Sequence, residues 1–138
     1  MAGDESGIKI YGEQRGAAWC DFDADGRVDL VVTENASDTR LYRNKSAKAG
    51  LRVRLHGPAG NAFGVGAVVR LKSGEKWGPA HEVHAGSGYW SSDSVVQVMS
   101  LSEPIQEIQV RWPGGQVTTG AVPTGAQEVT VAFEGGVK

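Results

Sequence analysis

The chain has 138 residues, 40% of them hydrophobic, which suits one domain, or one small domain with an appendage. Its formal net charge of −2 gives no broad basic field, so nucleic acid and anionic membrane surfaces are not expected partners. No apolar run reaches the roughly 18 residues of a membrane-spanning helix, so no membrane span is expected.

The N-terminal segment and the single cysteine give two further expectations. Residues 1–6 lack the basic and apolar regions of a secretory signal peptide, so we expect no such leader in this chain. The chain is then either cytoplasmic or a piece of a longer protein, and composition does not decide between the two. Cys20 cannot form an internal disulfide, and no Cys/His spacing supports zinc, so we expect an inert small side chain there.

Short apolar runs between glycine-rich turns predict an all-β fold, an antiparallel sandwich or barrel-like domain preceded by a β-hairpin repeat. No stretch has a helical period of adequate length. The small polar residues 45–50 are the best candidate linker, dividing the chain into residues 1–48 and 49–138. In chain order, the expected strands are residues 8–11, 17–21, 28–33, 39–42, 51–56, 65–71, 77–85, 95–101, 105–112, 116–122 and 129–133.

The side chains that face the core are predicted by alternation. Residues 51–56 alternate apolar with basic side chains, which is typical of a half-buried strand with one wet face. The Trp-Pro-Gly-Gly sequence at residues 112–115 predicts a tight hairpin turn. We expect Trp19 and Trp112 to lie inside the fold. The other expected inward side chains are Leu51, Val53, Leu55, Val65, Ala67, Val69 and Leu71.

The most informative stretch is residues 21–30, Asp-Phe-Asp-Ala-Asp-Gly-Arg-Val-Asp-Leu, in which carboxylates stand at alternate positions. In a loop that coils back on itself these carboxylates converge and repel one another, and a hard cation removes that cost. Calcium prefers six to eight oxygen ligands in a flexible cage. We therefore predict a Ca²⁺ site formed by the side chains of Asp21, Asp23, Asp25 and Asp29, the backbone carbonyl of Arg27, and water.

Two alternatives to this calcium loop are weaker. Aspartate and glycine are common turn residues, but turn chemistry explains one or two of these aspartates rather than four at fixed spacing. An EF-hand requires glutamate at its twelfth position, which falls here on Val32, and it requires flanking helices. The β-branched residues that follow predict a strand instead, so the loop joins two strands.

A candidate ligand surface follows the glycine-rich turn at residues 86–88. It consists of Tyr89, Trp90 and Asp93. Exposed aromatic rings offer contact area to a sugar or a protein, and the alternative is that they plug the end of the sandwich. His81 and His84 do not match the helical zinc-protease motif, because their spacing is three and they fall on an expected strand. No strained nucleophile elbow is present, so we expect no enzyme.

The N-terminal part resembles one FG-GAP or VCBS-type repeat. The resemblance rests on residues 19–26, Trp-Cys-Asp-Phe-Asp-Ala-Asp-Gly, on residues 29–32, and on residues 41–44, Leu-Tyr-Arg-Asn. In that family such repeats build the blades of integrin-α-like β-propellers, and the Asp-rich loop binds Ca²⁺. The resemblance therefore implies the same metal role for the four aspartates that match the motif.

Residues 51 to about 131 resemble the ASPIC/UnbV domain, on the stretches 61–67, 82–92 and 110–115. This domain usually lies at the C-terminal end of secreted proteins that carry such repeats, among them the cartilage acidic protein group. Two departures are present: residues 97–102 lack the His-Phe-Gly-Leu-Gly-like run of the family, and only one repeat precedes the domain.

Together, these features imply a non-enzymatic, Ca²⁺-binding module that works outside the cell or in the periplasm. It would bind an unknown protein or glycan, and its metal would be structural. Two alternatives stay open. One is an accessory or catalytic domain acting on carbohydrate, with a site that includes Tyr89, Trp90, Asp93 and His84. The other is an architectural cap on the upstream repeats of a β-propeller in a longer chain.

Overall fold

The computed structural model describes residues 3–86, 88–100 and 104–138. These residues form one helical turn and twelve strands, and no described helix is long and apolar enough to cross a membrane. The elements are α1 (Gly3–Ser6), β1 (Gln14–Cys20), β2 (Asp29–Glu34), β3 (Arg40–Tyr42), β4 (Leu51–His56), β5 (Val68–Ser73), β6 (Lys76–Trp77), β7 (His81–Glu82), β8 (Gln97–Met99), β9 (Glu107–Arg111), β10 (Val117–Ala121), β11 (Glu128–Ala132) and β12 (Gly136–Val137).

The C-terminal part is a sandwich of two sheets, in agreement with the all-β prediction. One sheet has the order β10-β9-β5-β6, with β7 also paired to β5, and the other has the order β12-β11-β4-β8. All pairs in these sheets are antiparallel except β4 with β11, which run in parallel. The sheets approach closely where β12 meets β10, because a Cβ at Gly120 would lie 2.5 Å from Val137 Cγ2.

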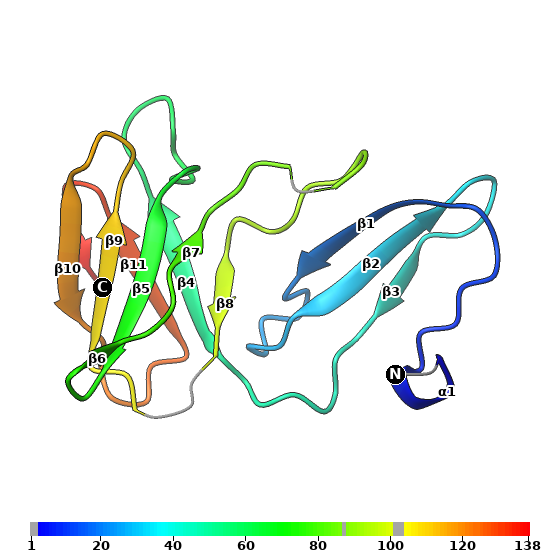
Figure 1. Cartoon of the computed structure of the whole chain (residues 1–138), viewed down its shortest axis with the longest axis horizontal. Helices are drawn as coiled ribbons and strands as arrows, with labels where there is room; N and C mark the ends of the chain where they lie inside the picture. Colours follow the sequence, from blue (N-terminus) through cyan, green and yellow to red (C-terminus); the bar gives the residue numbers. More distant parts are fainter. Residues whose placement is uncertain (1–2, 87, 101–103) are drawn as a thin grey trace.

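The N-terminal part is a separate antiparallel sheet in the order β1-β2-β3. It stands beside the sandwich, joined to it by residues 43–50, while the segment between β7 and β8 reaches across toward β1 (Figure 1). That segment lies along the outer edge of β1. There the Trp19 N–H donates to Asp93 Oδ1 at 2.8 Å, and the Ser94 N–H donates to the Trp19 carbonyl at 2.8 Å. The edge strand is thus hydrogen-bonded on both sides.

The hydrophobic core lies between the two sheets of the sandwich, and its described members all come from residue 51 onward. The predicted alternation is confirmed in β4, where Leu51, Val53 and Leu55 are buried and their basic neighbours are more exposed. Ala67, Val69 and Leu71 are likewise buried. Val65, also predicted to face inward, is only half-buried.

Trp112 closes one end of the sandwich, as expected. It is 1% exposed, its Nε1 donates to Thr118 Oγ1 at 2.8 Å, and its ring meets Phe133 edge-on at 5.5 Å between centroids. The turn after it is confirmed by the hydrogen bond from Gly115 N to the Trp112 carbonyl at 3.0 Å. Burying the indole with its N–H paired satisfies both its apolar and its polar requirements.

Several local predictions were wrong. Residues 8–11 form no strand, since they pair with no neighbouring strand. The expected strand 77–85 is broken into two short pieces around Pro79, which has no N–H to donate to a ladder. Strand β12 was not expected. Of the expected strand 95–101, the structure forms only Gln97–Met99, which is β8. Residue 101, the last of that expected strand, lies outside the described residues, and so do residues 101 and 102 of the segment 97–102 that departs from the family pattern.

Trp19 was expected inside the fold and is instead 53% exposed. Its strand β1 belongs to the thin N-terminal sheet, where Val32 and Asp29 are the fully buried residues among those described. A single sheet without a second layer cannot enclose an indole ring.

Candidate functional site

The acidic loop connects β1 to β2, and its ends are held together where Cys20 pairs with Asp29. Ala24 and Gly26 have positive φ values of 59° and 79°, so the chain coils back on itself between the two strands. Glycine adopts this conformation without a steric cost, and alanine does so at a cost that the surrounding loop must offset.

Three of the predicted ligands converge at this loop. Carboxylate oxygens of Asp21, Asp23 and Asp29 all lie within 4.8 Å of one another. Asp29 is 1% exposed, and its two oxygens accept hydrogen bonds from the N–H groups of Phe22, at 2.9 Å, and Asn44, at 2.8 Å. A buried carboxylate held by backbone donors is fixed in position before any cation arrives.

Asp21 is fixed in the same manner, within the loop itself. Its oxygens accept the N–H groups of Asp25 at 3.0 Å and Gly26 at 2.9 Å, and its side chain is 2% exposed. Asp23 is the most exposed member of the cluster, and its carboxylate is paired with the Arg43 guanidinium.

Asp25, the fourth predicted ligand, is not part of this cluster. Its carboxylate accepts a hydrogen bond from Arg27 Nη1 at 2.7 Å and a longer one from Arg43 Nη2 at 3.4 Å. Desolvation raises the pKa of the Asp25 carboxyl, but the hydrogen bonds and charge of Arg27, with the bond from Arg43, outweigh it and lower the pKa overall. Arg27 also donates through Nε to the Ala47 carbonyl at 2.8 Å, so its side chain ties the loop to the following segment.

Arg52 connects the loop to the sandwich. Its Nε lies 2.8 Å from Asp21 Oδ2 without the alignment of a hydrogen bond, so the contact is an ion pair. The same guanidinium pairs with Glu128 on β11, and the Arg52 side chain is 14% exposed. Alongside it, Gly50 N donates to the Gly26 carbonyl at 2.7 Å. The loop therefore rests directly on the start of β4.

The donor set of the cluster fits a hard divalent cation. Asp21, Asp23 and Asp29 offer carboxylate oxygens only, which calcium and magnesium prefer, and no described Cys or His joins the group. These three residues would hold the metal. When bound, the cation would supply charge neutralisation, while the chain's own N–H donors keep Asp21 and Asp29 in place.

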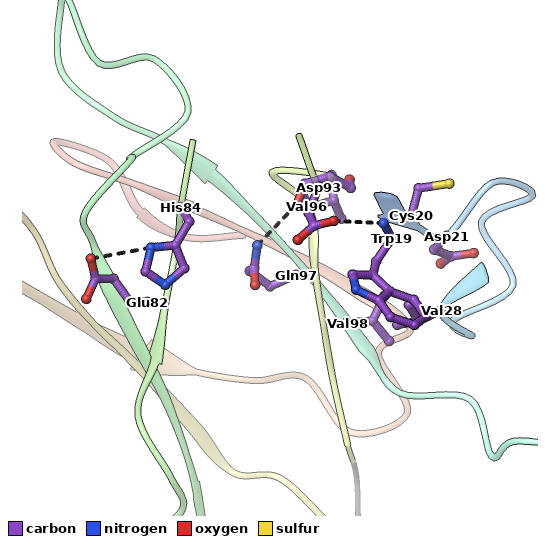
Figure 2. Close-up of a pocket in the computed structure, with 11 residues that line it drawn as sticks. Trp19, Cys20, Asp21, Val28, Glu82, His84, Asp93, Val96, Gln97 and Val98 are labelled. Carbon is purple, nitrogen blue, oxygen red and sulfur yellow. Dashed lines mark hydrogen bonds and ion pairs between the residues drawn. The ribbon is translucent and has the colours of Figure 1, made fainter. Parts of the chain in front are cut away.

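A cleft of about 190 Å³ lies beside the loop, between the N-terminal sheet and the sandwich. Trp19 and Asp93 stand side by side at one end, and the Glu82–His84 pair, with 3.7 Å between Oε1 and Nδ1, stands at the other (Figure 2). Gln97 and three valines, Val28, Val96 and Val98, also line the cleft. Asp21 borders both the cleft and the acidic loop.

Cys20 also lines the cleft, and its thiol is held in the neutral form. Burial raises the pKa of the Cys20 thiol, and the carboxylates of Asp29 and Asp21 raise it further. The thiolate is the nucleophilic form of cysteine, so this setting disfavours thiol chemistry at neutral pH.

The predicted ligand surface is split by the structure. Asp93 lines the cleft, whereas Tyr89 and Trp90 lie outside the set of lining residues and are 68% and 86% exposed. Their rings are 6.0 Å apart at a tilt of 50°, and Trp90 has a positive φ of 54°. Sequence reasoning missed Trp19 and Gln97 as lining residues, because the cleft forms only when the two parts of the chain meet.

The fold and the loop define an all-β chain in which a sandwich carries a thin N-terminal sheet and an acidic turn. Residues 57–137 match the family described as ASPIC and UnbV, and this is more than half of the chain, so the chain belongs to that family. The match confirms the resemblance of the C-terminal part, and it does not extend to the N-terminal sheet. No curated protein matches the chain.

Proposed function

We propose that the chain is a non-enzymatic, calcium-stabilised β module of an extracellular or periplasmic protein, which binds a protein or a glycan. The observation that carries this proposal is the convergence of Asp21, Asp23 and Asp29, with carboxylate oxygens within 4.8 Å of one another. We further propose that the N-terminal sheet is an FG-GAP-type repeat, as in cartilage-acidic-protein-like chains. Its three-stranded meander and its Asp-rich turn between β1 and β2 support this assignment.

The metal's role would be structural rather than catalytic. Two of the three carboxylates are nearly buried and already hold loop N–H groups, so a cation there stiffens the turn. Extracellular Ca²⁺ modules often bind at about 10⁻⁴ to 10⁻³ M, which external calcium saturates. The Asp25 carboxylate is paired with the Arg27 guanidinium. Together with the Arg27 carbonyl it would complete the shell only if the cation draws this carboxylate away from the guanidinium.

The test is calorimetric titration of the chelated protein with Ca²⁺, with Mg²⁺ as a control, followed by thermal unfolding in calcium and in chelator. At a calcium concentration 10 to 100 times the dissociation constant, we expect about 1.4–2.7 kcal/mol of added stability. Asp23→Ala should abolish both the heat of binding and the calcium-dependent rise in melting temperature. Asp38→Ala, an exposed aspartate in the turn after β2, is the matched control and should retain both. No heat and no shift in the unchanged protein would reject the calcium site.

A second candidate function is an architectural cap on further propeller repeats. It is favoured by the N-terminal sheet, which contributes nothing to the described core of the sandwich and exposes Trp19 and Leu41 at 53% and 43%. Phe22, in the loop between β1 and β2, is 70% exposed. A repeat of this kind buries its faces only against neighbouring repeats. Joining one additional repeat to the N-terminus should then raise the melting temperature, and an unchanged value would count against the cap.

A further inference from the structure

Two aromatic side chains occupy the centre of a tight turn in the segment between β7 and β8. Gly88 and Ser91 form an antiparallel bridge, so Tyr89 and Trp90 are the two residues that reverse the chain. The segment reaches from the sandwich across toward β1 (Figure 1). Such turn positions usually carry Gly, Asn or Asp, which are small or tolerate a positive φ. Turn chemistry therefore does not explain the two aromatic residues.

Trp90 combines a strained backbone with an exposed ring. Its φ is +54°, in the left-handed region that bulky residues rarely adopt. The residue is 86% exposed, so burial of the indole does not offset this strain. Backbone strain of this kind clusters at active sites and ligand-binding sites. The turn thus presents the indole to solvent instead of packing it.

The backbone of the turn is braced against the N-terminal sheet. A Cβ at Gly16 would lie 3.2 Å from the Tyr89 carbonyl oxygen and 3.4 Å from that of Trp90, so the turn rests on β1 at that point. Further along the segment, the Ser94 N–H donates to the Trp19 carbonyl at 2.8 Å. The aromatic side chains therefore project from an anchored turn, and a ligand need not order the backbone first.

The two rings form an angled pair. Their centroids are 6.0 Å apart and their planes are tilted by 50°. Rings at this angle cannot both lie flat on one small ring, so each suits a separate member of a linked chain. The hydroxyl groups of Tyr89, Ser91 and Ser92 supply hydrogen-bond donors and acceptors in the same turn. Apolar faces bordered by hydroxyls match a pyranose sugar, which has C–H groups on its faces and hydroxyls at its edge.

Charge and size favour a neutral sugar over other partners. Residues 77–110 contain no Lys or Arg, and Arg15, next to Gly16 on β1, is paired with Glu13 at 2.7 Å. These residues thus offer no free cation to a phosphate, a sulfate or an acidic sugar. A protein interface of standard size buries about 800 Å² on each partner around an apolar centre. The small side chains beside the rings do not extend the surface to that size.

We propose that Tyr89 and Trp90 bind a neutral oligosaccharide, with the Trp90 indole stacked on one pyranose and the Tyr89 ring on the next. The proposal rests on the binding role given to the module under the proposed function, and it narrows the partner to a glycan. It does not depend on calcium, because the turn is separate from the acidic loop.

The experiment is NMR titration of the full chain, following the Trp90 indole N–H in calcium and in chelator. The probes are cellotetraose and chitotetraose, with methyl glucoside, tetragalacturonate and decaproline as comparisons. We expect saturable binding of at least one neutral tetramer, roughly tenfold weaker binding of the glucoside because it covers one ring, and none of the anionic tetramer.

Three results would overturn the proposal: no saturable shift with either neutral tetramer, equal affinity for the glucoside, or tighter binding of tetragalacturonate. Binding of decaproline without binding of the sugars would also overturn it, but would leave the module with a protein partner. Equal results in calcium and in chelator would separate this site from the calcium proposal.

Two variants assign the binding to the turn. Trp90→Gly keeps the positive φ without strain, so affinity should fall roughly tenfold while the melting temperature does not fall. A purely structural role of Trp90 would give the opposite pair of results. Tyr89→Ala should weaken binding roughly threefold to tenfold. Tyr11→Ala, at a residue that is 85% exposed in the N-terminal segment, is the matched control and should change neither quantity. Unchanged affinity in both folded turn variants would overturn the assignment.

Discussion

Gly64 is the residue at which the backbone and the core constrain each other most directly. Its φ is +65°, and a Cβ there would lie 2.9 Å from Leu55 Cδ1 and 3.0 Å from Trp112 Cζ3. Gly64→Ala combines a left-handed backbone cost with overpacking against buried side chains, so we expect a loss of about 2–5 kcal/mol in the free energy of unfolding. Chemical denaturation measures this loss.

The control for that substitution is Gly60→Ala. Gly60 also has a positive φ, +85°, but nothing lies within 4 Å of the added Cβ. It should lose only the backbone cost, about 1–2 kcal/mol. Equal losses at the two positions would show that contact with Leu55 and Trp112 does not matter.

The sequence predicted the acidic cluster more fully than the cleft. Alternate spacing identified Asp21, Asp23 and Asp29, because side-chain direction in a tight loop follows local geometry. Asp25 belongs to the same pattern but pairs with Arg27. Spacing alone does not show whether a carboxylate faces a metal ion or pairs with a neighbouring arginine. The exposure of Trp19 was missed because it depends on a second layer that β1 lacks.

At the scale of elements, the acidic loop is attached to the sandwich through Arg52. Arg52→Met keeps the length of the side chain but leaves Asp21, 2% exposed, without its guanidinium partner. An uncompensated buried carboxylate is costly, so we expect a loss of about 3 kcal/mol in the free energy of unfolding in chelator. Denaturation in urea, with and without Ca²⁺, measures it.

Arg54→Met is the matched control on the same strand. Arg54 pairs with Glu128 at 3.2 Å but is 43% exposed, and such pairs contribute about 0–1 kcal/mol. If calcium occupies the cluster, it also neutralises Asp21, and the loss in Arg52→Met should shrink in Ca²⁺. An equal, small effect of both substitutions in chelator would contradict the role given to Arg52.

The strands of the sandwich differ in how well they could be predicted. Alternation found β4 and β5, because one face of each is covered and the other is wet. It missed β12, whose two residues pair with β11 and have no pattern of their own. The parallel pairing of β4 with β11 joins strands far apart in the sequence, and it depends on the whole packing rather than on either segment.

For the whole molecule, the structure implies that the N-terminal sheet and the sandwich differ in their ability to fold alone. The described core consists of residues from Leu51 to Val131, with Phe133 and Val137 packed against it, and the N-terminal sheet contributes none of it. That sheet meets the rest of the chain through polar contacts at Asp21 and Asp93 and through the Gly50–Gly26 hydrogen bond. Three short strands with two buried residues have too little apolar burial to offset their conformational entropy.

We therefore expect residues 49–138 to fold alone and residues 1–48 to remain unfolded in isolation, even when calcium is present. Urea unfolding of the C-terminal fragment should be a single cooperative transition, and the amide spectrum of the N-terminal fragment should lack dispersion. Adding the N-terminal fragment to the folded C-terminal one tests whether the polar contacts suffice without the covalent link. A cooperative transition in residues 1–48 alone would show that the acidic loop and its cation stabilise the sheet by themselves. The N-terminal sheet would then be an independent calcium domain rather than a layer that needs a neighbour.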